Sequence, residues 1–176
     1  DSRERGLIES NPFHQKCIPT STGSNPARQA YVSIETTETV INACPSLEWK
    51  LLSALSRFAG LRTPTEPLAL RWRDVNWETK RMLVHCQKTE RHEGKATRTV
   101  PIFGRLYPYL KAAFDAKGDE EYVINGLGRD TGVNPRTQMI EIIEKAGVAL
   151  WPNLNNSPRA SCLTDLLDEG YSIKAT

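Results

Sequence analysis

Apolar residues recur at helical spacing between residues 46 and 60. Leucine, phenylalanine and alanine side chains repeat every three or four positions, which gives a helix one buried face. Ser46 suits the N-cap, and Gly60 suits the position after the helix, where a left-handed backbone ends it. The pattern predicts a well-packed helix that leaves Arg62 on a rigid support. Its apolar positions are Leu47, Leu51, Leu52, Leu55, Phe58 and Ala59.

Capping and stop signals predict further helices on both sides of this one. Thr36 or Thr37 can cap a short helix to Cys44, because Pro45 cannot continue it. The segment from Thr63 to Glu66 has the pattern of a capping box, although Pro67 favours a helix start at Thr65. Proline, asparagine and glycine signals predict three later helices, over residues 103–114, 134–146 and 156–169.

Two short segments have the pattern of strands, at residues 82–86 and 97–102. The segment between them is polar and contains glycine, so a β-hairpin is the natural connection. Residues 74–78 supply either a third strand or a turn. The predicted fold is therefore mainly α with one small antiparallel β-sheet, in the α+β class.

Residues 1–30 show little periodicity and are rich in Ser, Thr, Asn and Pro. We interpret them as a linker or extended arm, with the domain beginning near Tyr31 and running over residues 31–176. No apolar run approaches the roughly 20 residues of a membrane helix, and the start has no apolar core of a secretion signal. The scattered cysteines and histidines have no metal-ligand spacing, which favours reduced cysteines in a cytosolic protein and no bound metal.

The net charge of +2 hides an uneven distribution. Residues 50–111 contain thirteen Lys and Arg against five Asp and Glu, whereas the remainder contains ten against sixteen. Clustered basic charge is typical of a protein with a polyanionic partner, and the alternative is an ordinary solvated face.

Three basic residues within this pattern suit phosphodiester chemistry. Arginine neutralises the non-bridging oxygens with a planar fork that is always charged, which Arg62 and Arg159 can do. A lysine in the hairpin, Lys88, can donate a proton to the leaving oxygen. Two arginines and a lysine thus form a transition-state clamp, and the alternative for Arg62 is a surface ion pair with Glu66.

The order and spacing of these residues resemble the catalytic domain of the tyrosine recombinases, the phage-integrase family. The first box of that family is an apolar helix, Gly-Leu-Arg, a glutamate and Leu-x-Trp-x-Asp, and residues 59–75 follow it. A hairpin lysine and Arg-x-Val-Pro come next, matched by Lys88 and residues 98–101. The second box is His-x-x-Arg before Leu-Leu-x-x-Gly, matched by residues 156–159 and 166–170. The resemblance covers roughly residues 31–176.

The resemblance implies a role for each matched position. Arg62 and Arg159 would hold the scissile phosphate, Asn156 would contact it, Lys88 would act as general acid, and Glu66 would brace the first box. Lys95 competes with Lys88 for the role of the hairpin lysine. The hairpin residues implied to contact DNA are Thr89, Arg91, Lys95 and Arg98.

Two departures from the family pattern bear on activity. Asn156 stands where the family usually has histidine, and an amide cannot act as a base near neutral pH. The family's tyrosine nucleophile is expected about thirty residues or more after Arg159, and Tyr171 comes too early. We therefore expect a catalytic domain truncated before its nucleophile, with residues 1–30 as the remnant of an N-terminal DNA-binding domain.

The resemblance implies DNA integration or recombination through a 3′-phosphotyrosine intermediate, without a metal or other cofactor. The implied partner is double-stranded DNA, with self-association on DNA in the parent protein. It also implies a protein of bacterial or phage origin that acts in the cytoplasm on the nucleoid. The alternatives are a non-catalytic DNA-binding relative, and a helical interaction module with no role in nucleic-acid binding.

Overall fold

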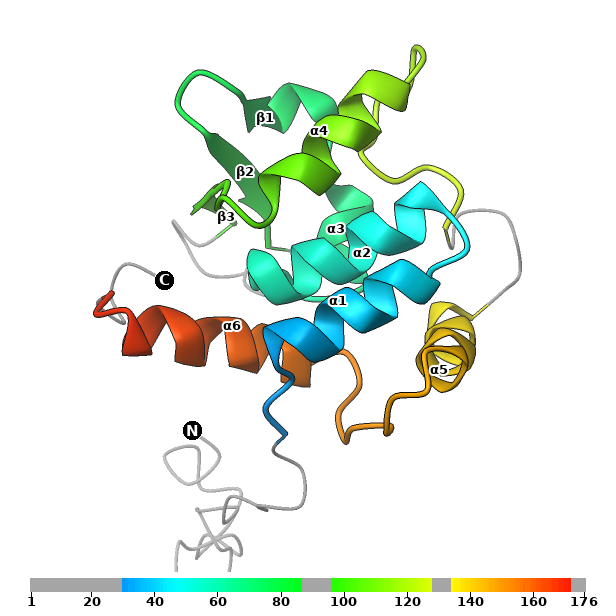
Figure 1. Ribbon diagram of the computed structural model, residues 1–176. Helices are drawn as coiled ribbons and strands as arrows, with labels where there is room; N and C mark the ends of the chain where they lie inside the picture. The colour runs from blue at the N-terminus through cyan, green and yellow to red at the C-terminus, as the bar shows by residue number, and fades with distance from the viewer. Residues whose placement is uncertain (1–29, 87–95, 128–133, 172–176) are drawn as a thin grey trace, which may run out of the picture.

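The computed structural model describes residues 30–86, 96–127 and 134–171. Two helices lie side by side at its centre, with a small sheet on one side and the last helix on the other (Figure 1). In chain order the elements are α1 (Ile34–Ala43), α2 (Leu47–Phe58), α3 (Thr65–Ala69), the 3-10 helix η2 (Trp72–Asp74), β1 (Val75–Asn76), β2 (Arg81–His85), β3 (Thr97–Pro101), α4 (Tyr107–Ala116), α5 (Pro135–Lys145) and α6 (Ser157–Asp168).

Helix α2 is the centre of the hydrophobic core. It packs against α1, α3, α4 and α6, and Leu51, Leu52, Ala54 and Leu55 are almost completely buried. A helix surrounded by other elements must be apolar on more than one face, as the leucine pattern of α2 is. Ser46 caps its start by accepting a hydrogen bond from the Trp49 N–H, as the sequence predicts. The end of α2 is therefore a fixed point from which the following loop departs.

The sheet is antiparallel, with the order β1-β2-β3. In the register of β2 and β3, Met82 lies opposite Val100 and Val84 opposite Arg98. Met82, Val84 and Val100 are buried, whereas Leu83 on the other face is exposed. Because side chains alternate along a strand, Arg98 must lie on the same inner face as Val100. The two predicted strands of the hairpin are confirmed, residues 74–78 contain both a two-residue strand, β1, and the start of a turn, and the fold is mainly α with a small antiparallel sheet.

The expected cap of the first helix is wrong. Helix α1 begins at Ile34, and Ser33, rather than Thr36 or Thr37, is its N-cap. The Ser33 Oγ accepts the Thr36 N–H at 3.1 Å, and the buried Thr37 hydroxyl donates to the Ser33 carbonyl at 2.9 Å. The threonines therefore lie inside the first turn, because a serine three residues earlier already satisfies the free N–H groups.

The expected capping box at residues 63–66 does not form. Helix α3 begins at Thr65, as Pro67 indicated, and its N-cap Pro64 has no side-chain acceptor. The Glu66 carboxylate instead accepts the backbone N–H of Arg62 at 2.8 Å. The Thr63 hydroxyl is buried without a hydrogen-bond partner among the described residues. Glu66 is thus directed toward the loop after α2.

The starts of α5 and α6 agree with the sequence, whereas α4 begins at Tyr107, four residues after the predicted start. Asn134 caps α5 with its side chain, and Pro108 lies in the first turn of α4. Helix α6 begins at Ser157 after Asn156, and Gly147 and Gly170 follow α5 and α6 with positive φ. None of the helices in the described ranges combines the length and apolar character that crossing a membrane requires.

Gly60 allows a test of the chain reversal after α2. Its φ is +63°, and an added Cβ would lie 3.6 Å from the Cys162 Sγ, an ordinary contact. Gly60→Ala should therefore lower the free energy of unfolding through backbone strain alone, by about 1–2 kcal/mol. Urea unfolding followed by tryptophan fluorescence measures this. Gly104→Ala, with open space around the new methyl group, is the matched control. Equal free energies of unfolding for Gly60→Ala and Gly104→Ala would contradict a left-handed backbone at Gly60.

Candidate functional site

One buried carboxylate joins two of the predicted site arginines. Glu66 is 3% exposed, and its Oε1 accepts hydrogen bonds from the Arg62 Nη1 at 3.0 Å and the Arg98 Nη1 at 2.7 Å. Its Oε2 accepts the backbone N–H of Arg62 at 2.8 Å and the Arg98 Nη2 at 2.7 Å. Four charge-assisted bonds therefore connect the loop after α2, helix α3 and strand β3.

Local structure explains why Glu66 reaches both partners. Its backbone N–H donates to the Arg62 carbonyl at 2.9 Å, so the chain makes one helical turn between the two residues. This turn places the two side chains on the same side of the loop. Arg98 approaches from the inner face of β3, where its Nη2 also donates to the Gly60 carbonyl at 3.5 Å. The sheet is thus joined to the end of α2.

The pKa of Glu66 reflects these bonds. Burial alone would raise it, but the hydrogen bonds and charges of Arg98 and Arg62 outweigh burial and lower the pKa from 4.5 to about 2. Glu66 is therefore an anion at every physiological pH. It holds Arg62 in place while leaving a third of that side chain exposed, at 34%.

Arg98 has a different environment from the one expected of a DNA-contacting residue. Its side chain is 23% exposed and its guanidinium is bonded to Glu66 and, at 2.9 Å, to the Cys86 Sγ. These contacts make it a brace between β3 and the first box. The period-two pattern of Arg98, Val100 and Ile102 was the sequence signal for this inward direction, and it was missed.

Arg159 lies in the first turn of α6, half-buried beside the same cluster. Burial lowers its pKa, and the nearby positive charges of Arg62 and Arg98 lower it further. Among the described residues no hydrogen bond or ion pair to its guanidinium is found, in contrast to Arg62 and Arg98. The cluster contains three guanidinium groups and one carboxylate, which binds two of them, so it has a net positive charge. Such a site is chemically suited to an anion.

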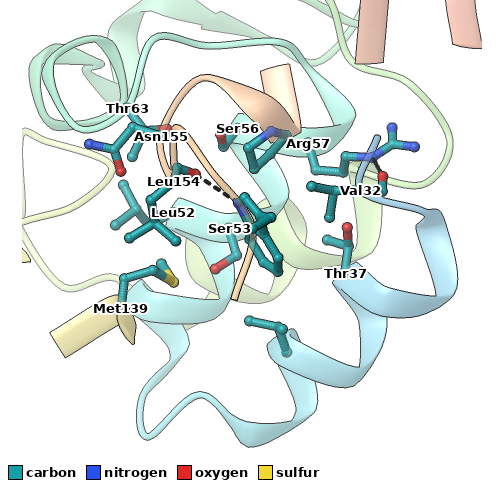
Figure 2. A pocket seen from close by; sticks show the side chains of 13 residues that line it. Val32, Thr37, Leu52, Ser53, Ser56, Arg57, Thr63, Met139, Leu154 and Asn155 are labelled. Atoms are coloured by element: carbon teal, nitrogen blue, oxygen red, sulfur yellow. Dashed lines mark hydrogen bonds between the residues drawn. The ribbon is translucent and has the colours of Figure 1, made fainter. Parts of the chain in front are cut away.

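A groove runs beside this cluster between the end of α2, strand β3 and α6. We call it the α6 groove, and Gly60, Arg98, Val100, Arg159, Cys162 and Leu166 are among its lining residues. The α6 groove thus contains two positively charged side chains, Arg98 and Arg159, among apolar wall residues. A second hollow, between α1, α2, α5 and the segment before α6, is largely apolar and contains Thr63 and Asn155 in its wall (Figure 2).

The structure does not bring Asn156 into the α6 groove. Asn156 is exposed, lacks a capping hydrogen bond and lines two other hollows, one with Arg136 and one with Ala160 and Thr164. Residues four apart form one row along a helix, so Asn156 shares a row with Ala160 and Thr164. Arg159 belongs to the neighbouring row, with Cys162 and Leu166.

Four of the predicted DNA-contacting or catalytic residues lie outside the described residues: Lys88, Thr89, Arg91 and Lys95. The segment that contains them begins and ends beside the cluster. The Cys86 N–H donates to the Ala96 carbonyl at 2.7 Å, and the Cys86 Sγ contacts Arg98.

Among the described tyrosines, only Tyr171 lines the α6 groove. Tyr31 donates to Asp165, Tyr122 stacks with Arg71, and Tyr107 and Tyr109 belong to α4. Tyr171 lines the α6 groove, but it follows Asp168, which is about 14 Å along the helix axis from Arg159.

Solved structures with this fold are recombinases and integrases. XerA recombinase matches with a TM-score of 0.65 and 19% identity over 86% of this chain and 56% of its own. A lambda integrase(75-356) dimer bound to a COC′ core site matches with a TM-score of 0.68 and 13% identity, over 99% of this chain and 64% of its own. The catalytic domain of bacteriophage HP1 integrase matches with a TM-score of 0.59 and 16% identity, over 83% and 76%.

The chain therefore has the fold of tyrosine-recombinase catalytic domains, as the sequence predicts. It spans less than two thirds of the XerA and lambda integrase chains. No family model and no curated protein sequence matches it. The likeness consequently lies in the fold alone.

The Glu66 ion pairs predict a pH-dependent contribution to stability. A pKa lowered from 4.5 to about 2 stabilises the folded state above the unfolded pKa, and this stabilisation is lost as the pH falls toward 2. Glu66→Gln should lower the free energy of unfolding near pH 7 by about 2–3 kcal/mol, with the deficit shrinking on acidification. Urea unfolding over this pH range measures it. The exposed Glu78 provides the control Glu78→Gln, and parallel pH profiles of wild type and Glu66→Gln would contradict the prediction.

Proposed function

We propose that this chain binds double-stranded DNA by holding a backbone phosphate between Arg62 and Arg159, as part of a DNA breaking and rejoining recombinase. The observation that carries the proposal is the half-buried Arg159, which has no ion-pair partner among the described residues and lies beside an Arg62 held by Glu66. A phosphate between them would supply the missing negative charge.

Arg62 retains donors for such a ligand. Its Nη1 and its backbone N–H are bonded to Glu66, and no bond to its Nη2 or Nε is found in the described part of the chain. A guanidinium has five N–H donors in a fixed fork, so Arg62 can bind Glu66 and a phosphate oxygen together. Prior orientation by Glu66 lowers the entropic cost of binding.

The other predicted site residues are assigned roles around the same phosphate. Lys88 or Lys95 would donate a proton to the leaving 5′-oxygen from a segment that starts beside Cys86 and Arg98. Asn156 would contact a neighbouring part of the DNA backbone, because it lies one helical row away from Arg159. Arg98 would support Arg62 through Glu66. We extend the proposal to action in the cytoplasm on nucleoid DNA, with residues 1–30 as an arm.

Solved structures with the same fold support DNA as the partner. One lambda integrase structure is a dimer bound to a COC′ core site, and another is a tetramer bound to a Holliday junction. We propose by analogy that the parent protein assembles on DNA. The basic balance of residues 50–111 suits this partner.

A second candidate is a DNA-binding relative without cleavage activity. Asn156 favours it, since an amide replaces the usual histidine and cannot act as a base near neutral pH. Both candidates require the phosphate clamp, so they differ in covalent chemistry and not in binding.

Substitution of the clamp residues tests DNA binding. Arg62→Ala and Arg159→Ala should each weaken binding to a fluorescein-labelled duplex about tenfold, because each removes a charge-assisted contact. Each should also reduce the slope of log affinity against log salt by about 1, through the loss of one counterion-releasing contact. Fluorescence anisotropy over a range of salt concentrations measures both quantities.

Arg71→Ala is the matched control, because Arg71 is half-exposed and already paired with Glu121 at 2.7 Å. It should change affinity much less than either clamp substitution. Unchanged affinity and salt slope in both Arg62→Ala and Arg159→Ala would reject the clamp.

A nicked suicide DNA substrate separates the two candidates. We expect the 176-residue chain to bind this substrate without forming a covalent adduct, because Tyr171, the described tyrosine that lines the α6 groove, follows the C-terminal end of α6 while Arg159 lies in its first turn. Denaturing gel electrophoresis with labelled DNA detects the adduct. An adduct that a single Tyr→Phe substitution removes would identify a nucleophile and overturn this expectation.

A further inference from the structure

An arginine inside α2 binds the helix that carries Arg159. Arg57 is 2% exposed, and its Nε donates to the Val32 carbonyl at 2.8 Å, a bond visible in Figure 2. Its Nη2 donates to the Asp165 Oδ2 at 2.6 Å. Arg57 therefore connects the segment before α1, helix α2 and helix α6 through a single buried side chain.

Asp165 has a second partner from the same segment. The Tyr31 hydroxyl donates to its Oδ1 at 2.7 Å, and the Arg57 guanidinium carbon lies 5.6 Å from the centre of the Tyr31 ring. The Val32 N–H donates to the Ser161 Oγ at 2.8 Å. Residues 31 and 32 thus contact α6 at two positions one turn apart, which restrains its rotation as well as its distance.

Helix α6 packs against α2 without burying a large apolar side chain fully. Its buried residues are Ser157, Pro158, Ser161 and Cys162, all of them small or polar. Leu167 is exposed at 44%, so no large apolar side chain of α6 is fully buried. A buried ion pair adds little net stability compared with apolar packing, but it can specify one arrangement because its bonds are directional.

We infer that Arg57, Asp165 and Tyr31 are positioning residues that set α6 so that Arg159 completes the phosphate clamp with Arg62. The inference rests on the proposed function, since it assigns these residues to a clamp that binds DNA phosphate. Asp165 lies six residues from Arg159, about 9 Å along the axis, so a small rotation at Asp165 would move the guanidinium of Arg159.

The sign of one substitution distinguishes this role from a general charge effect. Asp165→Asn removes a negative charge and keeps the shape, so simple electrostatics predicts tighter DNA binding. The positioning role predicts the opposite, about three- to tenfold weaker binding with a salt slope lower by up to about 1. The control is Asp168→Asn, an exposed aspartate on the same helix, which should bind the duplex as tightly as wild type or slightly tighter.

A double-mutant cycle with Arg159→Ala supplies the decisive readout. If Asp165 acts through Arg159, Asp165→Asn should weaken DNA binding much less in an Arg159→Ala background than in wild type. A merely structural role would lower the unfolding temperature and leave the two effects on affinity additive. Additive effects, or unchanged affinity in Asp165→Asn, would overturn the inference.

Tyr31→Phe is a second, milder test of the same inference, for use if the Asp165→Asn variant does not fold. It removes the hydroxyl bond to Asp165 and leaves the Arg57–Asp165 pair in place, so the variant should stay folded by circular dichroism. It should weaken DNA binding by about twofold, again only when Arg159 is present. Wild-type affinity in a folded Tyr31→Phe variant would count against the inference. Failure of Arg159→Ala to weaken binding would instead reject the clamp itself.

Discussion

The site depends on the Glu66 carboxylate, a buried anion shared by Arg62 and Arg98. Without it, the guanidinium groups of Arg62 and Arg98 would lie near that of Arg159 with no negative charge bonded to them. The carboxylate neutralises part of the positive charge, which allows the cluster to form in the folded protein. The positive charge that remains can bind an anion. The same group thus stabilises the junction between sheet and helices and orients the arginine exposed to ligand.

Helix α2 positions both Arg62 and helix α6. Gly60 ends it with a left-handed turn that directs Arg62 toward Glu66, while Arg57, one turn earlier, holds α6 through Asp165. Helix α2 therefore positions both arginines of the proposed clamp. Arg62 follows it directly along the chain, and Arg159 is held through the Arg57 side chain and Asp165. The packing of the core around α2 therefore sets the distance and the orientation between the Arg62 and Arg159 guanidinium groups.

Most elements could be predicted from local patterns. The leucine spacing of α2, the alternation in β2 and β3, and the proline and asparagine starts of the later helices are local signals. The start of α1 was missed because Ser33 and Thr36 are equally good caps by residue type, and only the hydrogen bonds distinguish them. The capping box failed since Glu66 had stronger donors in Arg62 and Arg98 than in its own turn.

The sequence by itself determined the order of helices and strands, the resemblance in fold, and the basic residues available for a phosphate. Only the tertiary structure decided that Arg98 bonds to Glu66 and that Arg57 bonds to Asp165. The physical reason is separation along the chain. Helix and strand periodicities come from neighbouring residues, whereas these pairs lie 32 and 108 positions apart and meet only when the core packs.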